Sequence, residues 1–172
     1  MKEIPLTQGK VALVDDEDYN ELSKFKWHAH LCSGHWYAVR RARESHNLKT
    51  ILMHRSIMNA PTGLMVDHKN GDGLDNQRSN MRLATNSQNA ANSKKVGNTR
   101  SIYRGVTRIG KQVFWTASIK VNGDSMYLGR FQYERDAALA YDEKAFEVFG
   151  EFARLNFPEE LRASTAIRKA GQ

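Results

Sequence analysis

The sequence predicts an α+β protein in two parts: a ββα unit preceded by short strands, then a three-stranded antiparallel sheet packed on one helix. Three observations predict this fold. Short alternating segments with β-branched and aromatic residues recur along the chain. An asparagine-rich stretch over residues 65–92 has the pattern of strand, glycine-turn loop, strand and helix. Three further alternating segments precede one long segment with helical spacing.

The first 50 residues predict strands joined by tight turns. A Ser33-Gly34 turn joins the second and third strands as a hairpin, and Phe25, Trp27 and Ala29 share one face of the second. The predicted segments are strands at Lys10–Val14, Lys24–His30, Trp36–Arg43 and Lys49–Met53, with an acidic turn at Asp15–Asp18.

The asparagine-rich stretch predicts the ββα unit. A short helical segment ends before Pro61, and Gly63–His68 is then a strand that enters the stretch. Met81–Ala84 is the second strand. Thr85 and Gln88 have the spacing of a capping box, so a helix begins at this point.

The second part predicts a sheet and its covering helix. Asn122-Gly123 is a strong hairpin signal between its last two strands. The predicted strands are Tyr103–Ile109, Val113–Val121 and Ser125–Phe131, and the helix is Glu134–Phe149, with Gly150 as its stop and an apolar stripe of Ala137, Ala138, Tyr141, Ala145, Val148 and Phe149. The domains expected are the ββα unit with its preceding strands over 1–93, a linker over 94–101, a sheet-and-helix domain over 102–160 and a tail over 161–172.

Charge indicates an acidic partner, most often nucleic acid. The net charge is +7 over 172 residues. Residues 76–100 carry five basic side chains and no acidic one, whereas residues 132–160 carry eight acidic and three basic ones. Arg40, Arg41 and Arg43 either contact phosphate or are ordinary strand-surface residues, and the sequence leaves both interpretations open.

Several classes are excluded by what the sequence lacks. No apolar run approaches the roughly 18 residues that a membrane span needs, and the first residues lack the apolar core of a signal peptide. A single Cys32 excludes an internal disulfide and a cysteine-rich zinc site. We therefore expect a cytoplasmic protein without a membrane partner.

The asparagine-rich stretch has the residue types for phosphodiester hydrolysis. This reaction needs a base to deprotonate water and a cation to offset charge on the phosphate. His68 has a suitable intrinsic pKa, and Asp67 and Asn89 offer the oxygen ligands that Mg²⁺ or Mn²⁺ prefers. Adjacent side chains of a strand point to opposite faces, so the strand must end or twist at His68 if both are to act. Asn70-Gly71 follows directly.

The segment VDHKNGDGLDNQRSNMRLATNSQNAAN, preceded by MHR at residues 53–55, resembles the HNH endonucleases, especially phage and intron homing nucleases. The resemblance implies a ββα-metal nuclease unit with His68 as general base and one Mg²⁺ or Mn²⁺ held by Asp67 and Asn89. It also implies that Asn80 holds the loop and orients His68, and that His54 has a supporting role. Asn76, Asn86 and Asn92 are expected to be turn, cap and surface residues, respectively.

Residues 103–158 resemble the plant Apetala-2/ethylene-response-factor DNA-binding domain, through YRGV, YLGRF, AALAYDEKA and LNFP. The resemblance implies a sheet that lies in the major groove of double-stranded DNA. Serines at 118 and 125 replace base-reading arginines of the plant proteins, which indicates looser sequence reading. The helix-facing positions expected are Trp115, Ala117, Ile119, Met126 and Leu128, and the DNA-binding residues expected are Arg104, Arg108, Lys111, Thr116, Ser118, Lys120, Ser125 and Tyr127.

Together these features predict a metal-dependent DNA endonuclease with a separate recognition domain. The arrangement is typical of a monomeric homing endonuclease from a phage or mobile element, acting in the host cytosol without a small-molecule cofactor. One alternative is a sequence-specific DNA-binding regulator with a vestigial nuclease unit. Another is a non-specific or structure-specific nuclease of phage DNA processing.

Overall fold

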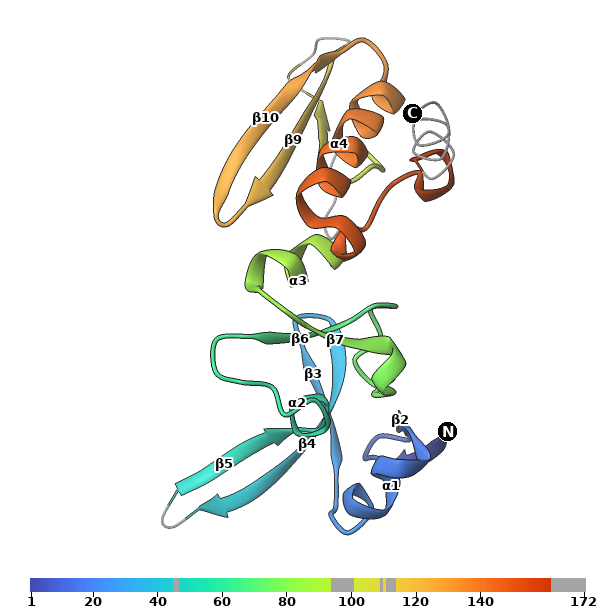
Figure 1. Ribbon diagram of the computed structural model, residues 1–172, viewed down its shortest axis with the longest axis vertical. Coiled ribbons are helices and arrows are strands. Elements are labelled where there is room, and N and C mark those ends of the chain that lie inside the picture. The colour runs from blue at the N-terminus through green and yellow to red at the C-terminus, as the bar shows by residue number, and fades with distance from the viewer. Residues whose placement is uncertain (45–46, 94–100, 109, 111–113, 162–172) are drawn as a thin grey trace, which may run out of the picture. The chain divides into compact units, whose positions relative to one another are not determined.

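The computed structural model describes residues 1–44, 47–93, 101–108, 110 and 114–161, and it divides into two compact units, Met1–Thr85 and Asn86–Gln172. Figure 1 labels their helices and strands. Within those described ranges, no helix is long and apolar enough to cross a membrane. The predicted linker falls outside the described residues except for Ser101, and the predicted tail does so after Leu161.

The first unit consists of short elements joined mostly by tight turns. Their bounds are β1 Lys2–Pro5, β2 Val11–Val14, α1 Asp16–Leu22, β3 His28–Cys32, β4 His35–Glu44, β5 Asn47–Leu52, α2 Met53–Ile57, β6 Met65–His68, a 3-10 helix η1 Arg78–Asn80 and β7 Met81–Ala84.

The N-terminal hairpin leads into a helix that the sequence did not predict. β1 pairs antiparallel with β2, and Asp15 is the N-cap residue of α1. Asp16, Glu17 and Asp18 occupy the first turn of that helix. Carboxylates at a helix N-terminus interact favourably with the helix dipole, so they stabilise this short helix. The predicted acidic turn at Asp15–Asp18 is therefore wrong, because these residues begin a helix.

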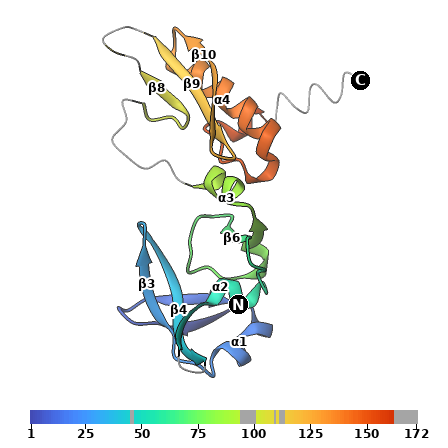
Figure 2. The same ribbon diagram turned by 90° about the vertical axis from the view of Figure 1, so that its left-hand side faces the viewer.

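The strands β3, β4 and β5 form an antiparallel sheet with β4 in the centre. Figure 2 shows β3 and β4 as a long hairpin. Ser33 and Gly34 both have positive φ, which confirms the predicted two-residue turn. β3 begins only at His28, later than predicted. Phe25 therefore lies before the strand and is 45% exposed, whereas Trp27 is buried.

One hydrophobic core joins the N-terminal strands to the hairpin of β6 and β7. Both strands of this hairpin were predicted, and they pair with Asp67 opposite Arg82. The pairing ends at His68, where a turn closes with a 2.8 Å hydrogen bond from Gly71 N to His68 O. The buried members of the core are Ile4, Ala12, Val14, Leu22, Trp27, Ala38, Met53, Ile57, Val66 and Met81.

The second unit begins with a short helix, followed by a three-stranded sheet in the order β10-β9-β8 and by a long helix. Figures 1 and 2 show α4 along one face of this sheet. Positive φ at Asn122 and Gly123 confirms the predicted hairpin, and α4 ends at Gly150 as predicted. The bounds are α3 Asn86–Asn92, β8 Val106–Arg108, β9 Trp115–Val121, β10 Asp124–Phe131, α4 Glu134–Phe149 and a 3-10 helix η2 Gly150–Phe152.

The core of the second unit lies between α4 and the sheet. Two predicted core positions are exposed, Val148 at 37% and Met126 at 44%. Met126 pairs with Ile119 on the helix side, and it lies on β10, an edge strand of the sheet. The remaining stripe residues Ala137, Ala138, Tyr141, Ala145 and Phe149 are buried, with Ala117 and Ile119 of β9 packed in the same two clusters.

A buried carboxylate ties the C-terminal segment to α4. Asp142 accepts hydrogen bonds from Asn156 N (2.9 Å), Asn156 Nδ2 (3.0 Å) and Phe157 N (2.7 Å). Burial raises the pKa of the Asp142 carboxyl, although these donors oppose the shift. The Asn156 side chain also accepts from Arg104 N at 2.7 Å. Residues 155–158, the LNFP segment, are therefore hydrogen-bonded both to α4 and to Arg104.

Candidate active site

The site loop, residues 69–80, joins β6 to β7 and is held closed by Asn80. The Asn80 side chain accepts from Asn70 N at 3.1 Å and donates to Asp75 O at 2.9 Å and Asn70 Oδ1 at 3.1 Å. Its backbone carbonyl accepts from Lys69 N at 2.8 Å. These bonds bring both ends of the loop together, which is the loop-holding role expected of Asn80.

Asn76, not Asn80, makes the hydrogen bond to the His68 ring. Its Oδ1 lies 3.3 Å from His68 Nε2, and its Nδ2 donates to Leu74 O at 3.1 Å. The side chain is 0% exposed, and the backbone N donates to Leu13 O at 2.8 Å. A buried amide needs such partners, because leaving it unpaired is costly. Asn76 thus orients His68, whereas the sequence assigned it only a turn.

The imidazole of His68 lies beside a buried ion pair. Asp67 Oδ2 accepts from Arg82 Nε at 2.8 Å, and both side chains are largely buried. Burial lowers the pKa of His68, while the hydrogen bond to Asn76 and the Asp67 carboxylate oppose that shift. The ring is therefore neutral at neutral pH, which is the form that can accept a proton from water.

Two aromatic rings, those of His54 and Tyr37, pack around this imidazole. His54 meets His68 edge to face at 5.3 Å between ring centroids, and Tyr37 lies 5.5 Å from His54 and 6.3 Å from His68. His54 is buried, and its Nδ1 has no hydrogen-bond partner among the described residues. Burial lowers its pKa to about 3, with the neighbouring His68 as a smaller cause. This packing is compatible with the supporting role expected of His54, and no sequence motif pointed to Tyr37.

The N-terminal elements hold the site loop in place. Leu13 N donates to Leu74 O at 2.9 Å, so β2 extends onto the loop. The Asp15 carboxylate accepts from Arg78 N at 2.8 Å and Gln77 Nε2 at 3.3 Å. These contacts explain why Asp15 makes no side-chain bond to its own helix.

The predicted metal ligands lie on two different elements. Asp67 is on β6 of the first unit, and Asn89 is half-buried on α3 of the second unit. Among the described residues, no group of three His, Cys, Asp or Glu side chains is arranged to hold a metal ion. A carboxylate and an amide oxygen nonetheless fit Mg²⁺, which needs only one or two protein ligands. The pairing of Asp67 with Asn89 stays a prediction.

Strand register arranges the predicted DNA-binding residues of the second sheet. Five of them lie on the side of the sheet opposite α4, here called the outer face: Thr116, Ser118, Lys120, Ser125 and Tyr127. Arg108 instead pairs with Trp115 and stacks 5.7 Å from its ring, so it belongs to the α4 side. Lys111 lies outside the described residues.

Arg130 was missed because a bulge reverses the expected alternation. The register shifts between Tyr127 and Gly129, so Arg130 pairs with Thr116 on the outer face. Its guanidinium stacks 4.0 Å from the centroid of the Phe114 ring. Positively charged and aromatic groups thus lie together on this face.

Arg104 points into the second unit. Its guanidinium donates to Tyr141 Oη at 2.6 Å, to Ala90 O at 2.6 Å and to Ser93 O. The two carbonyls belong to the C-terminal end of α3, where backbone acceptors lack intrahelical partners. Arg104 therefore caps α3, in a position where we had expected a DNA contact.

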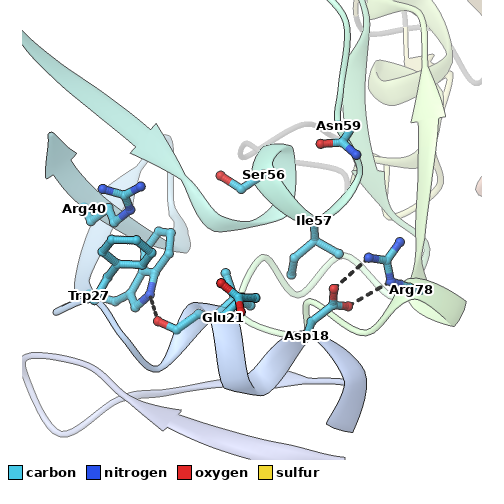
Figure 3. Close-up of a pocket in the computed structure, with 10 residues that line it drawn as sticks. Asp18, Glu21, Trp27, Arg40, Ser56, Ile57, Asn59 and Arg78 are labelled. Carbon is cyan, nitrogen blue, oxygen red and sulfur yellow. Dashed lines mark hydrogen bonds and ion pairs between the residues drawn. The ribbon is translucent and has the colours of Figure 1, made fainter. Parts of the chain in front are cut away.

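A separate pocket of about 230 Å³ opens beside α1 (Figure 3). Arg78 forms an ion pair with Asp18 there, and Arg40 stacks 4.0 Å from the Phe25 ring. None of the predicted catalytic or metal-binding residues lines it. Of the three arginines that were open to a phosphate role, Arg40 is thus engaged with an aromatic ring.

Comparison with known proteins identifies sequence relatives of the chain. Residues 59–91 match the family model described as HNH endonuclease. An HNH endonuclease of Acanthamoeba polyphaga mimivirus is 34% identical over 155 residues, which are 87% of this chain and 76% of that protein.

Plant proteins match a smaller part of the chain. Dehydration-responsive element-binding protein 2C of Arabidopsis thaliana is 44% identical over 68 residues, 37% of this chain and 19% of that protein. An AP2-like ethylene-responsive transcription factor of the same plant is 44% identical over 72 residues, 41% of this chain and 12% of that protein. The predicted combination of HNH-like and Apetala-2-like sequence is confirmed. The mimivirus relative and the matched motif, with its histidine, aspartate and loop asparagines gathered on β6 and the site loop, show that the chain belongs to the HNH endonuclease family.

Proposed function

We propose that the protein is a metal-dependent DNA endonuclease that hydrolyses phosphodiester bonds, with His68 as the general base. The observation that carries this proposal is the neutral, buried imidazole of His68, held by Asn76 beside the Asp67 carboxylate. Family membership supports nuclease activity.

The tautomer of His68 follows from its hydrogen bond. An Nε2–H that donates to Asn76 Oδ1 leaves Nδ1 as the basic nitrogen, which can take a proton from the attacking water. Asn80 contributes indirectly, because it holds the loop that carries Asn76. His54 packs against the imidazole and supplies no charge, since its lowered pKa keeps it neutral.

Asp67 and Asn89 would hold one Mg²⁺ or Mn²⁺ as its protein ligands. A divalent ion there supplies charge stabilisation for the phosphate and the leaving oxygen. Arg82 already neutralises Asp67 through Oδ2, so the carboxylate would be shared between Arg82 and the ion. This makes Arg82 a residue that limits how strongly the site attracts cations.

The second unit is proposed to bind double-stranded DNA through its outer face. The names of the plant relatives describe an element-binding protein and a transcription factor, which supports this assignment. Lys120 and Arg130 can contact phosphate or guanine, and Tyr127, 64% exposed, offers an apolar surface. The first unit, with α3, would cut, and the sheet-and-helix domain would select the site.

We further propose that the protein is a monomeric homing endonuclease of a phage or mobile element. A separate DNA-binding domain raises the effective concentration of a weak cutter at its target. Sequencing the ends cut from a random-DNA library tests this role. A shared motif at the ends is expected, whereas cleavage without one would favour the non-specific nuclease.

The decisive experiment for catalysis is cleavage of supercoiled plasmid with Mg²⁺, with His68→Ala and with chelator. We expect the rate to fall by roughly 10²–10⁴-fold in the variant, the usual contribution of a general base. His30→Ala is the matched control, because His30 is exposed on β3. Undiminished cutting by His68→Ala would remove His68 as the base. Tight DNA binding without cleavage by the wild type would favour a regulator.

A further inference from the structure

Tyr37 links the N-terminal sheet to the proposed base. It lies on β4, and its ring contacts both His54 and His68. The contact joins residues 31 positions apart in sequence, so it exists only because the N-terminal sheet folds against the motif. No part of the proposed mechanism so far uses Tyr37.

The site loop packs directly against the ring of Tyr37. A Cβ at Gly73 would lie 2.7 Å from Tyr37 Cδ1 and Cε1 and 2.4 Å from Trp36 O. Real Cβ atoms do not approach other atoms so closely, so only glycine permits this contact. Gly73 belongs to the same loop as Asn76, which holds His68. The ring of Tyr37 thus contacts the loop and the imidazole together.

The hydrogen bond that His68 makes to Asn76 is supplemented by ring packing around the imidazole. Its 3.3 Å length is beyond the usual 2.7–3.2 Å range for such bonds, so it is weak. The edge-to-face contact with His54 and the tilted contact with Tyr37 restrict how the ring can turn.

We propose that Tyr37 is a positioning residue for His68 and that its ring has this effect. The N-terminal sheet would then contribute directly to the geometry of the nuclease site. The inference rests on the proposed role of His68. The Tyr37 hydroxyl makes no hydrogen bond with any described residue, so the ring, and not the hydroxyl, carries the effect. A positioning error of about 1 Å at a catalytic group can cost on the order of 100-fold in rate.

The test compares Tyr37→Met with Tyr37→Phe in the full chain. Methionine fills a similar volume without a ring, and phenylalanine keeps the ring without the hydroxyl. We expect Tyr37→Met to lower kcat by about 10-fold or more with little change in KM, and Tyr37→Phe to restore kcat to within about two-fold of wild type. Tyr19→Met is the matched control, because Tyr19 packs against the same core away from both histidines.

Unchanged kcat in a folded Tyr37→Met variant, or an equal loss in Tyr37→Phe, would overturn the proposal. A second measurement needs no cleavage and no variant. In the metal-free wild type, NMR cross-relaxation is expected between the ring protons of Tyr37 and those of both imidazoles, and its absence would also refute the inference. If the wild type cuts no DNA, the proposed function fails while the cross-relaxation still decides the packing.

Discussion

Acidification should destabilise the first unit, because His54 is buried as a neutral ring. Its folded pKa of about 3 lies below its ordinary value of 6.5. Protons therefore bind the unfolded state in preference, and stability is complete above pH 6.5 and falls as the pH drops toward 3. Between pH 7 and pH 5 the unfolding free energy should fall by about 2 kcal/mol from His54 alone. His68 adds to the loss, since burial lowers its pKa as well.

Urea unfolding of the first unit at several pH values measures this loss, followed by the indole N–H signal of buried Trp27. His54→Leu should flatten the dependence on pH, leaving the smaller part from His68. His30→Gln, an exposed control, should not change it. An NMR titration should show the His54 ring neutral down to pH 5. A His54 ring that titrates near 6.5, or a pH dependence unchanged in His54→Leu, would refute the reasoning.

Three further predictions concern residues whose contacts the sequence did not reveal. Asn76→Ala removes two side-chain hydrogen bonds of a buried residue, so the unfolding free energy should fall by about 2–4 kcal/mol and kcat should fall, while exposed Asn86→Ala changes neither. Arg104→Ala should speed amide hydrogen exchange in α3, and unaltered exchange would show that the cap is unimportant. Arg130→Ala should weaken DNA binding about tenfold and lower the salt dependence by roughly one phosphate contact, in filter-binding or anisotropy titrations. Arg135→Ala, on α4, should do neither of these.

Local signals predicted the elements whose ends are marked in the sequence. The bounds of α4 were predicted to the residue, because its apolar stripe repeats over four turns and Gly150 stops it. The hairpin at Asn122-Gly123 followed from turn chemistry alone. α1 was missed, since its seven residues are too few to show a helical stripe and its acidic start has the composition of a turn.

The site contacts depend on tertiary structure, which spacing does not reveal. Asn76 and Asn80 lie in the same loop, and only the fold shows that the first bonds to His68 and the second to the loop itself. Asn92, expected at the surface, is buried. Arg130 was overlooked because strict alternation does not foresee a bulge, which moves every later residue to the other face.

The cap that Arg104 places on α3 bears on any attempt to retarget this nuclease. Ala91 of α3 packs in the same cluster as Tyr141, and Asn122 N donates to Ser87 Oγ at 3.0 Å. The helix that carries Asn89, α3, thus packs against the Apetala-2-like sheet and helix. Replacing residues 102–160 with a foreign DNA-binding domain would remove these contacts together with the specificity proposed for the outer face. A working chimera therefore needs a graft that keeps Arg104 and Tyr141 and exchanges only outer-face residues.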